Sequence, residues 1–236
     1  MIAIPTRSVV LLIMMLSTYP VVAQDNEWKL KPLQYNSPGL KVDLGVGLWS
    51  WPMPMDYDKD GDMDLLVACP DKPSNGVFYF ENATQDPTNS KPVFKRAVRL
   101  GNTTHNFQIS HTNGTPRILK PGYEFPRDPR TGQFNFSKPI KIYPRTNIHN
   151  QSVRGNMWRY VDYDGDGDQD LIVGVGDWSD YGWDDAYDQS GQWKNGPLHG
   201  YVYLIENEGT AEKPAYTNKP EKITASGSVI DVYGWP

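Results

Sequence analysis

Asp56-Tyr-Asp-Lys-Asp-Gly-Asp-Met-Asp-Leu-Leu-Val67 and Asp162-Tyr-Asp-Gly-Asp-Gly-Asp-Gln-Asp-Leu-Ile-Val173 decide the fold of this 236-residue chain. In each stretch five aspartates alternate with other residues, a glycine follows the third aspartate, and an apolar run ends the pattern. Glycine permits the backbone conformation of a tight loop. A short apolar run after such a loop predicts a buried strand. The sequence therefore contains one loop-and-strand unit twice.

The alternating aspartates predict a cation site in each loop. Alternate carboxylates on a tight loop supply hard oxygen ligands at the spacing that calcium accepts. We expect the fourth aspartate of each loop to bind through its carbonyl, with its side chain facing solvent, and the others to bind through their carboxylates. The expected metal residues are Asp56, Asp58, Asp60, Asp62, Asp64, Asp162, Asp164, Asp166, Asp168 and Asp170.

Two other kinds of cation site fit these loops less well. An EF-hand would place a glutamate at loop position 12 and continue into a helix, whereas Val67 and Val173 stand there inside apolar runs. Magnesium prefers to keep several of its waters and needs fewer fixed carboxylates. An aspartate-rich turn without metal is the remaining alternative, although carboxylates so close together repel one another.

A third and degenerate unit lies midway between the two aspartate loops. Gly114 aligns with their glycines and is followed by the apolar pair Ile118-Leu119. His111, Asn113 and Arg117 stand where the acids would be. We therefore expect this loop to be free of metal.

Strand-like segments follow each of the three loops at similar spacing. Alternating or apolar residues, bounded by Gly and Pro, are typical of short strands in sandwiches and propellers. These segments indicate an all-β fold of about three four-stranded antiparallel blades. They are Gly76–Phe80 with Lys91–Arg96, Gly122–Phe125 with Lys138–Ile142, and Gly200–Ile205 with Lys219–Ile223.

The two aspartate loops, each followed by Leu-Leu-Val or Leu-Ile-Val, resemble the FG-GAP repeats of integrin propellers and of bacterial VCBS-type secreted proteins. The matching residues are Asp56 to Val67 and Asp162 to Val173, with Gly114 to Leu119 as a degenerate copy. The resemblance implies a β-propeller with calcium in the loops between strands, in a secreted or surface protein. It implies no particular activity.

The chain divides into three predicted segments. Residues 1–23 resemble a signal peptide, with Arg7 before a short apolar run and small residues at Val21-Val22-Ala23. Residues 24–48 form a lead-in strand region, and residues 49–236 carry the repeats. The final Trp235-Pro236 resembles Trp51-Pro52 before the first loop. We therefore expect the N-terminal part of a longer propeller, whose missing C-terminal blades would be its own partners.

Charge and cysteine usage agree with an exported calcium protein. The net charge is -5, and the two aspartate runs contain 10 of the 28 acidic residues. The acidity is therefore local, and a general nucleic-acid binder is not expected. Cys69 is the only cysteine, so bound metal is the expected clamp in an oxidising compartment. We predict a secreted, periplasmic or cell-surface location and no membrane span in the mature chain.

A ligand surface is predicted in the insert from about Asp177 to His199. Aromatic rings stack on apolar sugar faces, and the predicted ligand-binding residues are Trp178, Tyr181, Trp183, Tyr187 and Trp193. Alternatively, these rings pack over the blade. The predicted function is a calcium-binding repeat module that binds an extracellular glycan or protein.

The alternative function is part of a propeller-fold carbohydrate-active enzyme such as a polysaccharide lyase. Some propeller-shaped lyases use a His, a Tyr and an Arg to remove a proton next to a uronic carboxylate. The residues that could serve are His149, Arg154, Arg159, Tyr160, His199 and Tyr201. No spacing rule connects them, so the catalytic residues are left unassigned.

Overall fold

The structure is a computed structural model that describes residues 34–35, 45–84, 92–149, 152–182, 186–217 and 219–232. These residues belong to one compact unit that begins at Pro32. The predicted signal peptide (1–23), most of the lead-in region, Trp183 and the Trp235-Pro236 pair lie outside the described residues. No helix in the described part of the chain is long and apolar enough to cross a membrane.

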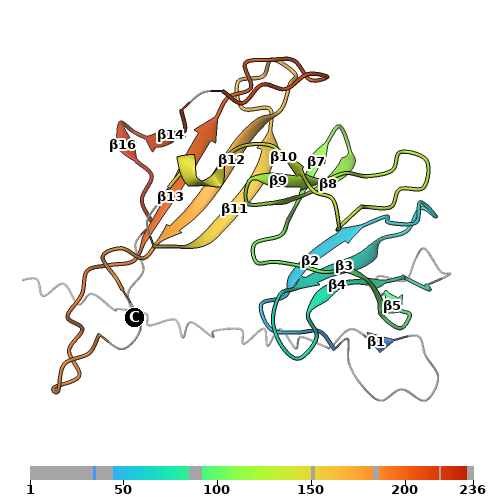
Figure 1. Cartoon of the computed structure of the whole chain (residues 1–236), viewed down its shortest axis with the longest axis horizontal. Helices are drawn as coiled ribbons and strands as arrows, with labels where there is room; N and C mark the ends of the chain where they lie inside the picture. Colours follow the sequence, from blue (N-terminus) through green and yellow to red (C-terminus); the bar gives the residue numbers. More distant parts are fainter. Residues whose placement is uncertain are drawn as a thin grey trace, which may run out of the picture. The chain divides into compact units, whose positions relative to one another are not determined.

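The described chain is all-β, as the sequence predicts, and contains three four-stranded antiparallel sheets (Figure 1). The first sheet has the order β2 (Trp51–Met55), β3 (Asp64–Cys69), β4 (Gly76–Phe80) and β6 (Val98–Gly101). The second has the order β7 (Gln108–Thr112), β8 (Thr115–Lys120), β9 (Tyr123–Phe125) and β10 (Ile140–Lys141). The third has the order β11 (Val153–Val161), β12 (Asp170–Asp177), β13 (His199–Ile205) and β14 (Glu221–Lys222). Each sheet runs in chain order, as propeller blades do.

The remaining elements are short. They are β1 (Gln34–Tyr35), β5 (Val93–Phe94), the 3-10 helix η1 (Arg145–Asn147), β15 (Thr224–Ala225) and β16 (Ser228–Val229). The segment Lys91–Arg96 is predicted as the outer strand of the first blade, but its residues Val93–Phe94 form β5, which pairs in parallel with β1. The next strand, β6, takes the outer place. The Lys-Pro pattern is a local feature of the sequence. It does not determine which later segment pairs with β4.

Both faces of the middle sheet are covered. Ile118 and Leu119 are neighbours in β8, point to opposite faces and are both fully buried. Ile118 packs with Leu66 of the first sheet, and Leu119 packs with Leu171 of the third. This arrangement explains the continuous apolar runs after the loops, since a strand buried on both faces has no polar side. Burying one such side chain contributes about 1.5–3 kcal/mol.

The first strands of the second and third sheets, β7 and β11, are also joined by polar contacts. Ser110 in β7 donates its hydroxyl to the carbonyl of Tyr160 in β11 (3.1 Å). The amide of Tyr160 donates back to the same hydroxyl oxygen (3.0 Å). Ser110 is buried, so both bonds lie away from water and fix the position of one sheet against the next.

The loop between the first two strands differs among the sheets. In the second sheet a two-residue turn, Asn113-Gly114, joins paired Thr112 and Thr115. Both turn residues have positive φ (50° and 75°), which is the backbone that a tight antiparallel hairpin requires. The first and third sheets carry the long aspartate loops at this place. The three units therefore share their strands and differ in their loops.

Candidate functional site

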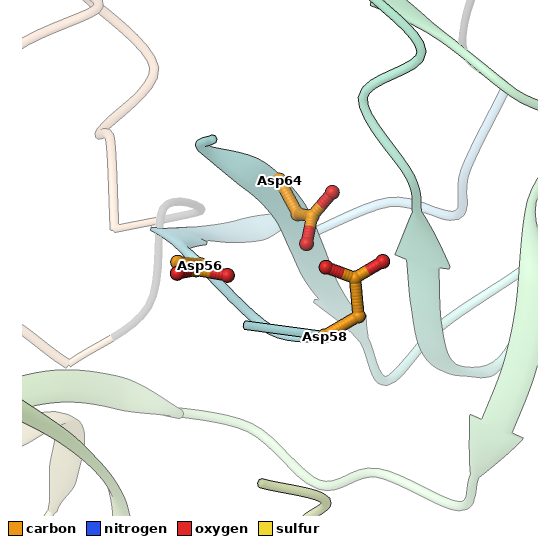
Figure 2. A group of neighbouring side chains, drawn as sticks. All are labelled: Asp56, Asp58 and Asp64. Carbon is orange, nitrogen blue, oxygen red and sulfur yellow. The ribbon is translucent and has the colours of Figure 1, made fainter. Parts of the chain in front are cut away.

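The first aspartate loop connects β2 and β3 and brings three carboxylates together. Single oxygens of Asp56, Asp58 and Asp64 all lie within 4.8 Å of one another (Figure 2). Asp64 is the first residue of β3 and is only 1% exposed. Asp58 is exposed and Asp56 is half-buried. The group is therefore open on one side and anchored in the sheet on the other.

The second loop connects β11 and β12 and gathers a different set. Oxygens of Asp162, Asp164 and Asp166 lie within 4.8 Å of one another, and all three residues are exposed. Four predicted residues stand outside these groups among the described residues, namely Asp60 and Asp62 of the first loop and Asp168 and Asp170 of the second. The structure thus brings six of the ten predicted residues into two groups of three.

The two loops share one backbone conformation. Asp58 accepts the amide of Asp60 (3.2 Å), and Asp164 accepts the amide of Asp166 (3.2 Å) at the equivalent place. The next aspartate repeats the pattern, since Asp166 accepts the amide of Asp168 (2.9 Å). Gly167 follows with φ of 92°, a region that favours glycine. Short side-chain-to-backbone bonds of this kind hold the carboxylates along the inside of a turn.

The last aspartate of each loop has a structural task that the sequence pattern did not reveal. Asp64 accepts the amides of Tyr57 (3.0 Å) and Asn82 (2.8 Å). Asp170 does the same for Tyr163 (2.9 Å) and Asn207 (2.8 Å). Each carboxylate therefore ties the start of its loop to the chain just after the third strand of the sheet.

The sequence does contain a signal for this tie. Glu81-Asn82 follows β4, and Glu206-Asn207 follows β13. The side-chain oxygen of Asn82 accepts the amide of Thr84 (3.0 Å). That of Asn207 accepts the amide of Gly209 (3.0 Å). The repeated Glu-Asn pair therefore marks a second repeated turn, which receives the aspartate bond from the loop.

The carboxylates of the first loop lie close enough to repel one another, although Lys95 offsets part of the charge of Asp58 and Asp60. Loss of hydration raises the pKa of Asp62 to about 6, and the charges of Asp60, Asp64, Asp58 and Asp56 add to the rise. Burial also raises the pKa of Asp64, although its two backbone hydrogen bonds oppose the change. A divalent cation would lower the energy of these carboxylates by supplying the missing positive charge.

Buried oxygens without a hydrogen-bond partner are the second sign of a cation site. Among the described residues, Oδ1 of Asp56 and of Asp62 is buried and accepts no hydrogen bond. Asp168 is only 6% exposed. The expectation that the side chain faces solvent is therefore wrong for Asp168, whereas Asp62 is half-buried. Hard oxygen donors in this number fit calcium.

Arg117, which stands where the middle unit would have its last acid, takes part in packing. Arg117 forms an ion pair with Glu124 of β9. Its guanidinium also lies 4.6 Å from the ring centre of Tyr160, whose hydroxyl donates to Glu124 (3.0 Å). Arg117 therefore joins the second sheet to the third.

The predicted ligand-binding aromatics of the insert contact one another. Tyr181 is 6% exposed and lies 4.5 Å from Trp193, measured between ring centres. Tyr187 lies 5.0 Å from the same ring and is 44% exposed. Trp178 packs edge-on against Tyr181 and lines a hollow of the surface. The insert thus has a small core of its own, and Trp178 is the member of the set that faces a cavity.

Of the residues weighed for lyase chemistry, the structure brings three rings together, since the ring of Tyr201 is centred 6.1 Å from that of His149 and 5.8 Å from that of His199. Tyr160 packs in the core beside Arg117, and Arg159 reaches Gln108 on the exposed side of β11 (3.3 Å). His199 lies 2.8 Å from Asp231 and 3.2 Å from Asp180. His149 also lies beside a tyrosine that the sequence analysis did not single out, because its Nδ1 is 2.9 Å from the hydroxyl of Tyr203.

No family model, curated protein or solved structure matches this chain. The likeness to FG-GAP and VCBS repeats therefore depends on the quoted residues and on the order of the strands.

Proposed function

We propose that this chain is a calcium-binding repeat module of the extracellular type, whose blades bind a glycan or protein ligand. The observation that carries the proposal is the gathering of three carboxylate oxygens within 4.8 Å in each aspartate loop. Buried oxygens without partners support it. Two loops with the same backbone bonds, at the same place in two sheets, are more readily explained by a common ligand than by chance.

Calcium in this proposal has a structural role. Asp56, Asp58 and Asp64 would hold the ion in the first loop, and Asp162, Asp164 and Asp166 in the second. The ion would cancel carboxylate repulsion and connect two strands of each sheet. An ion bound only by the folded state stabilises it by about 2.7 kcal/mol at 100 times the dissociation constant. In a domain of this size that is roughly 5–10 °C in Tm.

Thermal unfolding with calcium, with magnesium and after chelation tests the metal part of the proposal. We expect calcium to raise Tm far more than magnesium does. Asp58→Asn and Asp164→Asn keep the oxygen that accepts the loop amide but weaken the cation site, so each should reduce the calcium-dependent rise. Glu212→Gln, outside both loops, is the matched control. An equal Tm with and without chelator in the parent protein would contradict the proposal.

A lyase is the second candidate, and one contact favours it. His149 lies between the hydroxyl of Tyr203 (2.9 Å) and Oδ2 of Asp177 (3.0 Å), which is the order of groups that moves a proton to or from a tyrosine. However, Tyr203 is 6% exposed and burial raises its pKa. Incubation with a uronic-acid polysaccharide, followed by ultraviolet absorbance of an unsaturated product, separates the two functions: absorbance that grows with time identifies a lyase.

A further inference from the structure

A hollow of about 860 Å³ lies at the beginning of β2 and of β11, the first strands of the first and third sheets. The aspartate loops follow the opposite ends of these two strands. Residues at the start of β2 and β11 line it, together with the end of β12 and the connection before β7. Gly155 and Gly176, paired across β11 and β12, contribute to the lining and leave room above the sheet. The hollow is therefore distinct from the proposed calcium sites.

Aromatic rings and a guanidinium form the walls of this hollow. The guanidinium carbon of Arg154 lies 4.3 Å from the ring centre of Trp178 and 5.8 Å from that of Trp49. His105 packs edge-on against Trp49 (6.3 Å) and Trp51 (5.7 Å). The hollow thus combines flat apolar surfaces with a fixed positive charge.

Trp49 is held in a conformation that costs free energy. Its φ is 57°, in the left-handed region, and its side chain is 55% exposed. A residue other than glycine in such a region costs on the order of 1–3 kcal/mol and is concentrated at functional sites. His105 and Arg154 contact this indole, yet more than half of it stays exposed, and a ligand that covers the exposed part would account for its strained position.

A second and more polar hollow, of about 290 Å³, adjoins the first. The two share Asn106 and Val153 in their linings. Arg145 and His149 line the second hollow. No carboxylate belongs to the described lining of either hollow, although Asp177 lies 3.0 Å from Nε2 of His149. The chain as a whole has a net charge of -5, whereas the two hollows are lined by Arg154 and Arg145. The two hollows together therefore favour an anionic ligand.

We propose that the two hollows form one groove that binds an acidic polysaccharide. A pyranose ring would stack on the exposed indole of Trp49, and Arg154, held over Trp178, and Arg145 would pair with the carboxylate or sulfate groups of successive sugars. The inference deepens the proposed binding function and depends on it. Nucleic acid fits the groove less well, because its affinity comes from many phosphate contacts, and the described lining offers two arginines.

Calorimetric titration of the full chain in calcium tests this groove. The probes are hyaluronan, which carries carboxylates, dextran sulfate, which carries sulfates, and neutral dextran. We expect one or both anionic chains to bind, and the stronger one identifies the anionic group. Trp49→Ala and Arg154→Gln should each weaken that binding about tenfold or more, which corresponds to losing about 1.4 kcal/mol. Arg130→Gln, an exposed arginine outside the groove, is the matched control.

Three results would overturn the groove: equal binding of neutral dextran, tighter binding of an oligothymidylate than of either anionic glycan, or unchanged affinity in both variants. The calcium-dependent Tm of each variant must equal that of the parent, which shows that it is folded. Loss of the calcium response in the parent while hyaluronan or dextran sulfate still binds would refute the metal proposal and leave the groove intact. A normal calcium response without binding of either glycan would refute the groove alone.

Discussion

Replacing Asp170 by alanine separates the structural role of the last loop aspartate from calcium binding. Asp170 is 2% exposed, and its two oxygens accept the amides of Tyr163 (2.9 Å) and Asn207 (2.8 Å). Alanine leaves both amides without their acceptor. An unsatisfied buried donor costs about 1–3 kcal/mol. The amide of Asn207 is buried, whereas Tyr163 is 48% exposed and its amide costs less, so the two together should cost roughly 2–4 kcal/mol. In a domain of this size the expected fall in Tm is about 5–15 °C.

The decisive condition is the absence of calcium. Because the lost bonds are within the protein, Asp170→Ala should lower Tm in chelator, measured by scanning calorimetry. Asp164→Asn should lower Tm only in calcium, since it keeps its bond to the amide of Asp166. Asp170→Asn retains one acceptor oxygen and should fall between the parent and Asp170→Ala. If Asp170→Ala and the parent melt within one or two degrees of each other in chelator, the reasoning about this tie is refuted.

Two further predictions concern the third sheet. Leu171 is fully buried between the second and third sheets, and Leu171→Ala should reduce the free energy of unfolding by about 2–5 kcal/mol in urea denaturation; a loss below about 1 kcal/mol would contradict the packing. The hydrogen bond from His199 to Asp231 (2.8 Å) outweighs desolvation and raises the pKa of His199. This stabilisation is complete below the unfolded pKa of about 6.5 and is lost as pH rises through the higher folded pKa. His199→Asn should therefore destabilise the protein more at about pH 5.5 than at about pH 8.5, and an equal effect at both would argue against the contact.

The sequence predicted the features that depend on neighbouring residues. The aspartate spacing located both loops, and the apolar runs after them located β3 and β12. The pattern Gly122–Phe125 likewise corresponds to β9 apart from its glycine. These features are readable because alternation and turn chemistry act over a few residues.

Features that depend on distant pairing could not be read in the same way. The bond that the amide of Asn207 donates to Asp170 joins residues far apart in the chain, and its only local trace is the Glu-Asn pair. The groove likewise brings Trp49, His105 and Arg154 together from three segments. The burial of Asp168 follows from the path of its loop, which the alternation of acids alone does not determine.

Calcium stoichiometry tests the central claim most directly. Metal-free protein titrated with calcium in a calorimeter should bind two ions per chain. Asp58→Asn should remove or weaken the ion of the first loop, and Asp164→Asn that of the second loop. The double variant should bind neither ion tightly. A parent protein that binds no calcium, or a double variant that still binds two ions with parental affinity, would contradict the claim that these loops are metal sites.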